Sequence, residues 1–281
     1  METPTAPLSA ATRILADVGF RTPESVQHDR DQDVYFVSNV GGDPFEKDND
    51  GFIARVTPAG DVNPNFIVGG QKKVTLHAPK GMATVHDTLI VADLDVLRLF
   101  DRRTGAPRGQ LKVEGATFLN DVALGTDQKT IYVSDSGWKP GFEPSGTDAV
   151  YRVVDGKVSK LAGGRELGHP NGLWPDRGGT WVVTFGTGEL YFLGNDGKRS
   201  RVQKLDAGKL DGIVKSRDGS LLVASWEASA ILAGRPGEPF TPLLSGVESP
   251  ADIGYDRKRH RLLVPSFTKD ILVIHDLDED E

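Results

Sequence analysis

The chain has 281 residues, of which 38% are hydrophobic, and its 33 glycines and 17 prolines are typical of an all-β protein with many turns. Its formal net charge of −7 argues against a nucleic-acid or anionic-membrane partner. The absence of cysteine excludes disulfides, thiolate metal sites and a cysteine nucleophile.

Residues 1–11 are rich in proline, threonine and alanine, and we expect them to be disordered. They contain neither the basic segment nor the apolar run of a signal peptide, and a cytoplasmic protein or a mature exported one would have this sequence. No apolar run reaches the roughly 20 residues that a membrane span needs. The compartment and the oligomeric state stay open.

A strand is expected at Arg13–Val18, and a repeat begins after it. Each copy starts with a turn residue, a variable residue, a small residue and an aliphatic residue. The copies are Pro23–Val26, Pro79–Met82, Leu119–Val122, Pro170–Leu173, Leu210–Ile213 and Pro250–Ile253. Their variable residues are Glu24, Lys80, Asn120, Asn171, Asp211 and Ala251, at intervals of 56, 40, 51, 40 and 40 residues. A repeat near 40 residues indicates a modular fold.

A second short run, rich in β-branched and aromatic residues, follows each copy, and helical periodicity is weak throughout the chain. Four short strands per unit, repeated radially, form the blade of a β-propeller. The sequence therefore predicts an all-β, six-bladed β-propeller. The two longer intervals are explained by insertions at Asn39–Asp50 and Ser136–Asp148, between the second and third strands of their units.

The last unit ends with Ile271–Ile274 and is one strand short, so we expect the N-terminal strand to complete the last blade and close the ring. The single propeller domain would then span residues 12–276. Residues 277–281 would form a frayed acidic tail.

The variable residues are expected to surround the channel axis, because each stands at the start of an inner strand. Converging buried carboxylates without counter-charge are very costly, so such a cluster implies a cation. Glu24, Asn120, Asn171 and Asp211 supply oxygen ligands with a net charge of −2. This set favours Ca²⁺, with Mg²⁺ or Mn²⁺ less favoured and zinc least. The competing interpretation is that these residues only cap strand ends.

Antiparallel winding places the loops between second and third strands at the same mouth of the channel. Aromatic residues in these loops suggest a substrate with apolar surface. They are Phe45, Trp138, Phe142, Phe185, Trp226 and Phe267. From these loops and the Asn120 motif, the expected substrate-binding residues are Phe118, Trp138, Phe185 and Trp226.

The segments Pro23-Glu24, Leu119-Asn120-Asp121, Pro170-Asn171-Gly172 and Leu210-Asp211-Gly212 resemble the senescence-marker-protein/gluconolactonase family, which is similar in architecture to the paraoxonases and to diisopropyl fluorophosphatase. The resemblance covers the whole chain. It implies a six-bladed propeller with a central divalent metal, usually Ca²⁺, that hydrolyses lactones, esters or phosphoesters. It also implies that Glu24, Asn120, Asn171 and Asp211 occupy the positions of the metal ligands.

Three positions depart from these relatives. Phe118 stands where sugar lactonases carry a substrate-binding arginine, which puts gluconolactone in doubt as the substrate. Lys80 stands where paraoxonases have a catalytic histidine. Ser25 replaces an aspartate that helps to hold the second, structural calcium of the paraoxonases.

The leading hypothesis is metal-assisted hydrolysis of a small-molecule lactone or related ester. Asp211 and, less favoured, Asp121 are the candidate general bases. Lys80 would stabilise the oxyanion, bind a substrate carboxylate, or only neutralise surplus acid. A phosphotriester or fluorophosphate hydrolase with Asp211 as nucleophile is the first alternative. A non-catalytic binding propeller plugged by a metal is the second.

Other polar residues have plainer expected roles. His169 is expected to be a hydrogen-bonding loop residue, Asp93 and Asp135 to cap the loops that follow their strands, and Asp252 to bond within its own turn. Asp48–Gly51 looks like the start of a calcium loop, but an ordinary turn is favoured because the closing glutamate and the flanking helices of an EF-hand are missing.

Overall fold

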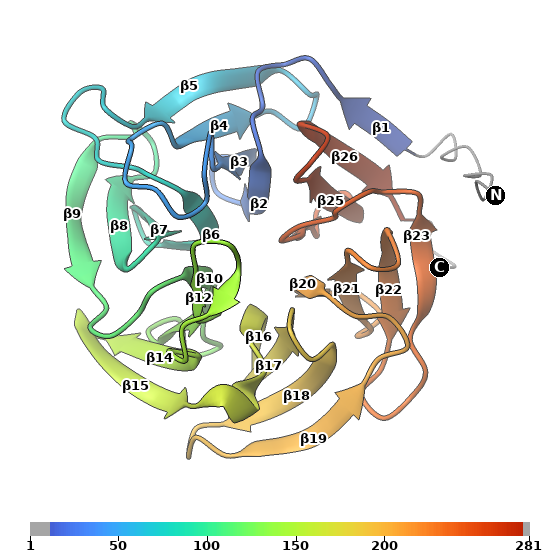
Figure 1. Ribbon diagram of the computed structural model, residues 1–281. Coiled ribbons are helices and arrows are strands. Elements are labelled where there is room, and N and C mark those ends of the chain that lie inside the picture. The colour runs from blue at the N-terminus through green and yellow to red at the C-terminus, as the bar shows by residue number, and fades with distance from the viewer. Residues whose placement is uncertain (1–11, 278–281) are drawn as a thin grey trace.

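A computed structural model of the protein describes residues 12–277 as a ring of six four-stranded antiparallel sheets around a central axis (Figure 1). The predicted six-bladed β-propeller is confirmed. The expected disorder of residues 1–11 and the acidic tail from residue 278 onwards lie outside the described residues. No helix within the described range has the length and apolarity needed to cross a membrane.

Blades 1 to 3 follow the order of the chain from the axis outwards. Blade 1 contains β2 (Pro23–Asp29), β3 (Val34–Asn39), β4 (Phe52–Val56) and β5 (Val62–Val68). Blade 2 contains β6 (Pro79–Val85), β7 (Thr88–Asp93), β8 (Val96–Asp101) and β9 (Pro107–Lys112). Blade 3 contains β10 (Leu119–Leu124), β11 (Ile131–Asp135), β14 (Ala149–Val154) and β15 (Lys157–Gly163). The insertion in blade 3 carries a small hairpin, β12 (Trp138–Lys139) and β13 (Glu143–Pro144).

A short 3₁₀ turn, η1 (Arg165–Leu167), leads into the second half of the ring. Blade 4 contains β16 (Pro170–Asp176), β17 (Gly179–Thr184), β18 (Glu189–Gly194) and β19 (Arg199–Lys204). Blade 5 contains β20 (Leu210–Lys215), β21 (Leu221–Ser225), β22 (Ala230–Gly234) and β23 (Thr241–Ser245). Blade 6 contains β24 (Gly254–Asp256), β25 (Arg261–Ser266), β26 (Ile271–Asp276) and, as its outer strand, β1 (Thr12–Leu15).

The N-terminal strand closes the ring as expected, because β1 pairs with β26 in antiparallel register from Thr12 opposite His275 to Leu15 opposite Leu272. The strand ends three residues earlier than the sequence suggested. Asp17 has a φ of 56°, in the left-handed region, and this turn ends the extended conformation before Val18.

Inner strands carry an irregularity at the repeated motif in blades 1 to 5. In blade 3, Leu119 pairs with Asp135 and Val122 with Val133, so Asn120 and Asp121 stand in a register shift between them. The same shift occurs in β2, β6, β16 and β20. A bulge bends the strand and redirects its side chains. The variable residue of each motif is thereby placed at the start of an inner strand, beside the channel.

Neighbouring inner strands lie so close that several motifs need glycine in third place. A Cβ atom on Gly172 would lie 2.4 Å from the carbonyl oxygen of Asp211, and one on Gly212 would lie 2.3 Å from the backbone nitrogen of Ile253. Such contacts are not possible, so glycine is a packing requirement at these two positions.

The hydrophobic core lies between adjacent blades rather than in the channel. Ile90 and Leu97 of blade 2 pack with Leu119 and Val133 of blade 3, and equivalent clusters join other blade pairs, including blade 6 with blade 1. The variable residues of the repeat therefore lie outside these clusters.

Candidate functional site: a buried oxygen cluster in the channel

Four buried oxygen atoms at the starts of inner strands have no hydrogen-bond partner among the described residues. They are Glu24 Oε2, Asn120 Oδ1, Asn171 Oδ1 and Asp211 Oδ1, on side chains that are between 2% and 5% exposed. An unpaired buried polar atom costs on the order of 1–3 kcal/mol. The four residues stand at the variable position of the repeat in blades 1, 3, 4 and 5.

The amide of Asn120 is held so that its oxygen stays available. Its Nδ2 donates to Ser136 Oγ at 3.1 Å, and the Ser136 hydroxyl in turn donates to the carbonyl oxygen of Pro170 in blade 4. The amide oxygen of Asn120 is therefore the end that remains unpaired.

The electrostatics of the cluster favour a cation. Burial, followed by the charge of Asp211, raises the pKa of Glu24 well above its usual value. Burial also raises the pKa of Asp211 to about 8, although the nearby Trp226 indole N–H and Asn171 amide oppose the shift. Trp226 forms no well-aligned hydrogen bond to Asp211, since Trp226 Nε1 and Asp211 Oδ1 are both unpaired. A divalent ion would remove the repulsion that these carboxylates otherwise experience.

Lys80 occupies the equivalent position in blade 2 and is fully buried. Its Nζ donates to the carbonyl oxygen of Ala78 at 3.0 Å and lies 4.2 Å from the centre of the Phe118 ring. Burial lowers the pKa of Lys80 to about 8, against the opposing charges of Glu24 and Asp93. Lys80 therefore contributes the cationic group near the cluster.

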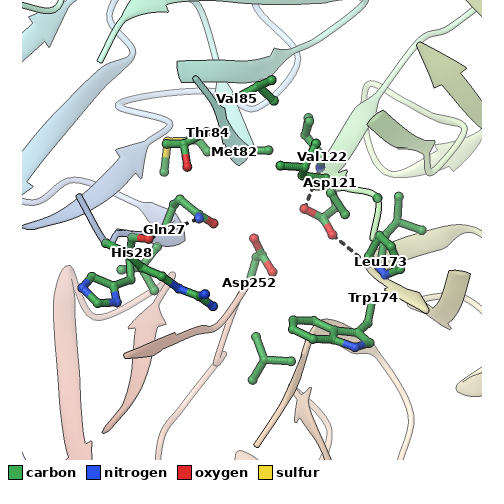
Figure 2. A pocket seen from close by; sticks show the side chains of 18 of the residues that line it. Gln27, His28, Met82, Thr84, Val85, Asp121, Val122, Leu173, Trp174 and Asp252 are labelled. Carbon is green, nitrogen blue, oxygen red and sulfur yellow. Dashed lines mark hydrogen bonds between the residues drawn. The ribbon is translucent and has the colours of Figure 1, made fainter. Parts of the chain in front are cut away.

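Asp121 and Asp252 lie on the other side of this ring and face a cavity of about 570 Å³, which opens at the ends of the inner strands (Figure 2). Asp121 accepts backbone N–H bonds from Val122 and Leu173, both at 2.6 Å. Burial raises the pKa of Asp121 to about 6, although these two bonds oppose the shift.

Asp252 does not bond within its own turn, and that expectation was wrong. Its Oδ2 accepts the hydroxyl of Ser25 in blade 1 at 2.5 Å, and Asp252 and Ser25 form a parallel bridge. Burial and the charges of Asp121, Glu24 and Asp211 raise its pKa. Asp252 stands one place after the variable residue of its copy, as Asp121 does in blade 3. Ser25 stands at the same place in its own copy, and this shared alignment was the signal in the sequence for a contact between the neighbouring blades 6 and 1.

The aromatic residues of the loops form two groups at the mouth of the channel next to the oxygen cluster. Phe45, Phe118, Trp138 and Phe142 make one group, with ring centres 4.9–6.3 Å apart. Phe185, Trp226 and Phe267 make the other, at 5.3 and 5.4 Å. Of the expected substrate-binding residues, Phe118 is 4% exposed, whereas Trp138, Phe185 and Trp226 are half-buried.

The remaining polar residues have structural contacts. His169 Nδ1 lies 2.7 Å from the carbonyl oxygen of Ser136, and its ring stacks on Trp138 at 3.7 Å. Asp93 accepts the backbone N–H groups of His77 and Ala78, which lead into an inner strand. Asp135 accepts those of Thr117 and Phe118 in the same way, and that of Gly137 in the loop that follows. The contacts of His169 and the bond from Gly137 to Asp135 agree with the expected roles, whereas Asp93 caps the segment before β6 and not the loop that follows β7.

One further group, His28, Asp33 and Asp256, brings possible metal-ligand atoms within 4.8 Å of one another. Arg259 forms ion pairs with Asp33 at 2.6 Å and with Asp256 at 2.8 Å. Lys258 forms a further ion pair with Asp33 at 2.7 Å. Because two cationic side chains already balance the two acids, we interpret this group as an ion-pair network that joins blades 1 and 6.

No protein-family model matches the chain, and no curated protein matches its sequence. Its structure is similar to a gluconolactonase of Xanthomonas campestris, with a TM-score of 0.71 and 18% identity over 95% of this chain and 90% of that one. It is also similar to regucalcin, a calcium-binding protein of Agrobacterium tumefaciens, with a TM-score of 0.66 and 16% identity over 93% of this chain and 92% of that one. For a virginiamycin B lyase of Staphylococcus aureus, the TM-score is 0.62 and the identity is 12% over 95% of this chain and 100% of that one. At these identities the likeness shows the shared propeller fold, which includes a gluconolactonase and regucalcin among its representatives but does not select one chemistry.

Proposed function

We propose that the protein is a divalent-metal-dependent hydrolase of lactones or related esters, with Ca²⁺ as the favoured ion. The observation that supports this most directly is the set of unpaired buried oxygens on Glu24, Asn120, Asn171 and Asp211. Two carboxylates and two amides match the oxygen ligands and charge that one Ca²⁺ requires. Four protein ligands also leave coordination positions for water and substrate.

Bound at this cluster, the ion would polarise a carbonyl group and stabilise negative charge on its oxygen. Asp211 is the favoured general base, because it lies beside Trp226, one of the aromatic residues at the mouth from which substrate would enter. Asp121 is less suited, since both of its oxygens already accept backbone N–H bonds and it faces the opposite cavity. Lys80 would stabilise the developing oxyanion with its ammonium group.

The test combines metal analysis with a substrate screen. Protein purified without chelator is analysed for bound metal, and hydrolysis of a panel of lactones and aryl esters is then measured before chelation, after chelation and after addition of Ca²⁺. We expect activity that disappears with the metal and returns with Ca²⁺. Full activity after exhaustive chelation would rule out the mechanism. Preferential turnover of phosphotriesters would support the alternative hydrolase.

A further inference from the structure

The two insertions that break the 40-residue repeat meet above the oxygen cluster. Phe45 comes from the loop between β3 and β4, and Trp138 and Phe142 come from the hairpin β12–β13, which lies beside the central opening over β10 (Figure 1). The ring centre of Phe45 lies 4.9 Å from that of Phe118 and 5.0 Å from that of Phe142. The ring centres of Trp138 and Phe142 are 6.3 Å apart. We name these four residues, Phe45, Phe118, Trp138 and Phe142, the aromatic wall.

The aromatic wall begins directly at the candidate metal ligands. Phe118 precedes Asn120 by two residues, and its ring lies 4.2 Å from Lys80 Nζ. Ser136, which bonds Asn120, precedes Trp138 by two residues. A molecule with its carbonyl at the oxygen cluster would therefore have its nearest substituents beside these rings.

Phe142 is the member of the wall that faces solvent. Its side chain is 52% exposed, although its ring contacts three other aromatic rings. Its backbone φ of 56° lies in the left-handed region, which is unfavourable for a bulky residue. Core packing does not account for an exposed phenylalanine in a strained conformation, whereas a ligand that covers the ring would.

The chemistry of the wall restricts what it can bind. Among its four side chains, the Trp138 indole N–H is the sole hydrogen-bonding group, and one face of that indole is already covered by His169 at 3.7 Å. The hydroxyl groups of a sugar lactone would lose water here without gaining partners, which is unfavourable. An aryl or alkyl group would instead gain contacts with ring faces and edges.

We propose that the aromatic wall binds an apolar substituent, aryl or alkyl, of the lactone or ester whose carbonyl lies at the oxygen cluster. This inference rests on the proposed function. It assigns the acceptance of apolar substrates to the two insertions, with Phe142 as the main contact and Phe45 as its support.

The experiment compares γ-butyrolactone, a γ-lactone with a phenyl substituent and gluconolactone as substrates of the wild-type protein and of Phe142→Ala. We expect the wild type to prefer the phenyl lactone. Phe142→Ala should lower kcat/KM for that substrate roughly tenfold and leave γ-butyrolactone within about twofold. Phe142→Leu should restore part of the loss. Phe66→Ala, which removes a ring from the outer strand β5, is the matched control and should change kcat/KM for neither the phenyl lactone nor γ-butyrolactone.

A binding measurement separates this inference from the proposed function. A phenyl-substituted cyclopentanone, which cannot be hydrolysed, is titrated into the Ca²⁺-loaded protein by calorimetry. Binding that Phe142→Ala or Phe45→Ala weakens, in a protein that hydrolyses no lactone or ester, would support the wall and end the proposed function. Hydrolysis that is equally fast with gluconolactone, or that Phe142→Ala lowers equally for all lactones, would overturn the inference while the proposed function stands.

Discussion

Replacement of Asp211 by asparagine should stabilise the metal-free protein more than the metal-loaded protein. In the metal-free state, burial raises the pKa of Asp211 from 3.8 to about 8. A carboxyl group with a raised folded-state pKa holds its proton more tightly when folded. Stability therefore falls as pH rises between these two values, by up to about 1.4 kcal/mol per pH unit. At pH 7 the folded state keeps Asp211 mostly protonated, whereas the unfolded chain ionises it, and this difference costs the folded state roughly 4 kcal/mol.

Asp211→Asn removes this cost, so the chelated variant should be more stable than the chelated wild type. For a domain of this size, 4 kcal/mol corresponds to a rise in Tm of roughly 8–16 °C, as an upper bound. The advantage should grow as pH increases from 5 to 8. In excess Ca²⁺ the wild type should gain about 2.7 kcal/mol at a hundred times its Kd, whereas the variant should gain much less. The difference should therefore shrink or reverse.

The assay is thermal unfolding followed by circular dichroism, in chelator and in Ca²⁺, at several pH values. Asp93→Asn is the matched control, because Asp93 is fully buried but accepts two backbone N–H bonds and pairs with Arg98 at 2.8 Å. That control should lose stability in both conditions. If Asp211→Asn loses stability in chelator as Asp93→Asn does, the charge of Asp211 is already compensated without metal, and the argument for a bound cation fails.

Four further predictions concern the channel residues and the contacts between blades 1 and 6. Glu24→Gln should abolish lactone hydrolysis and weaken Ca²⁺ binding in calorimetric titrations, with the circular dichroism spectrum unchanged; retained turnover would contradict its role as a ligand. Lys80→Met should lower kcat roughly 100-fold while Ca²⁺ affinity rises, because a positive charge near Glu24 is lost; an unchanged kcat would leave Lys80 as a neutralising charge. Arg259→Ala should lower Tm at pH 7. Arg259 and Lys258 hold the pKa of Asp33 below its usual value, so the difference in Tm between wild type and variant should decrease as pH falls below about 4, where Asp33 becomes protonated in the unfolded chain. A difference in Tm that does not change with pH would refute that account. Deletion of residues 1–18 should lower Tm sharply, because β1 closes the ring; the comparison is deletion of residues 1–11, which keeps β1.

The repeat made the fold predictable, because in blades 1 to 5 one motif marks both the start of the inner strand and its position beside the axis. The alternation of short strands and turns depends on local residue preferences, which a sequence displays directly. The same argument placed Glu24, Asn120, Asn171 and Asp211 at equivalent positions, and their unpaired oxygens agree with the hypothesis of a shared ligand. Their role as metal ligands stays a prediction.

Features that depend on contacts between blades were harder to predict. The bond from Ser25 to Asp252 joins residues 227 positions apart, and it depends on how closely blades 1 and 6 approach. The exposure of Phe142 and the burial of Phe118 depend on the path of two inserted loops. No periodic pattern encodes such a path. The sequence therefore identified the aromatic residues of the mouth but not which of them a ligand would meet.

The pairing of β1 with β26 has a consequence for how the protein is made. Thr12 Oγ1 bonds His275 across 263 positions of the chain, so β1 is synthesised long before β26, the strand with which it pairs. Until then, blade 6 lacks its outer strand, and the facing residues of blades 1 and 6 have not met. We therefore expect earlier blades to fold during synthesis and the closing contact to form after it. A chain released prematurely would expose an unpaired β-edge and be prone to aggregation.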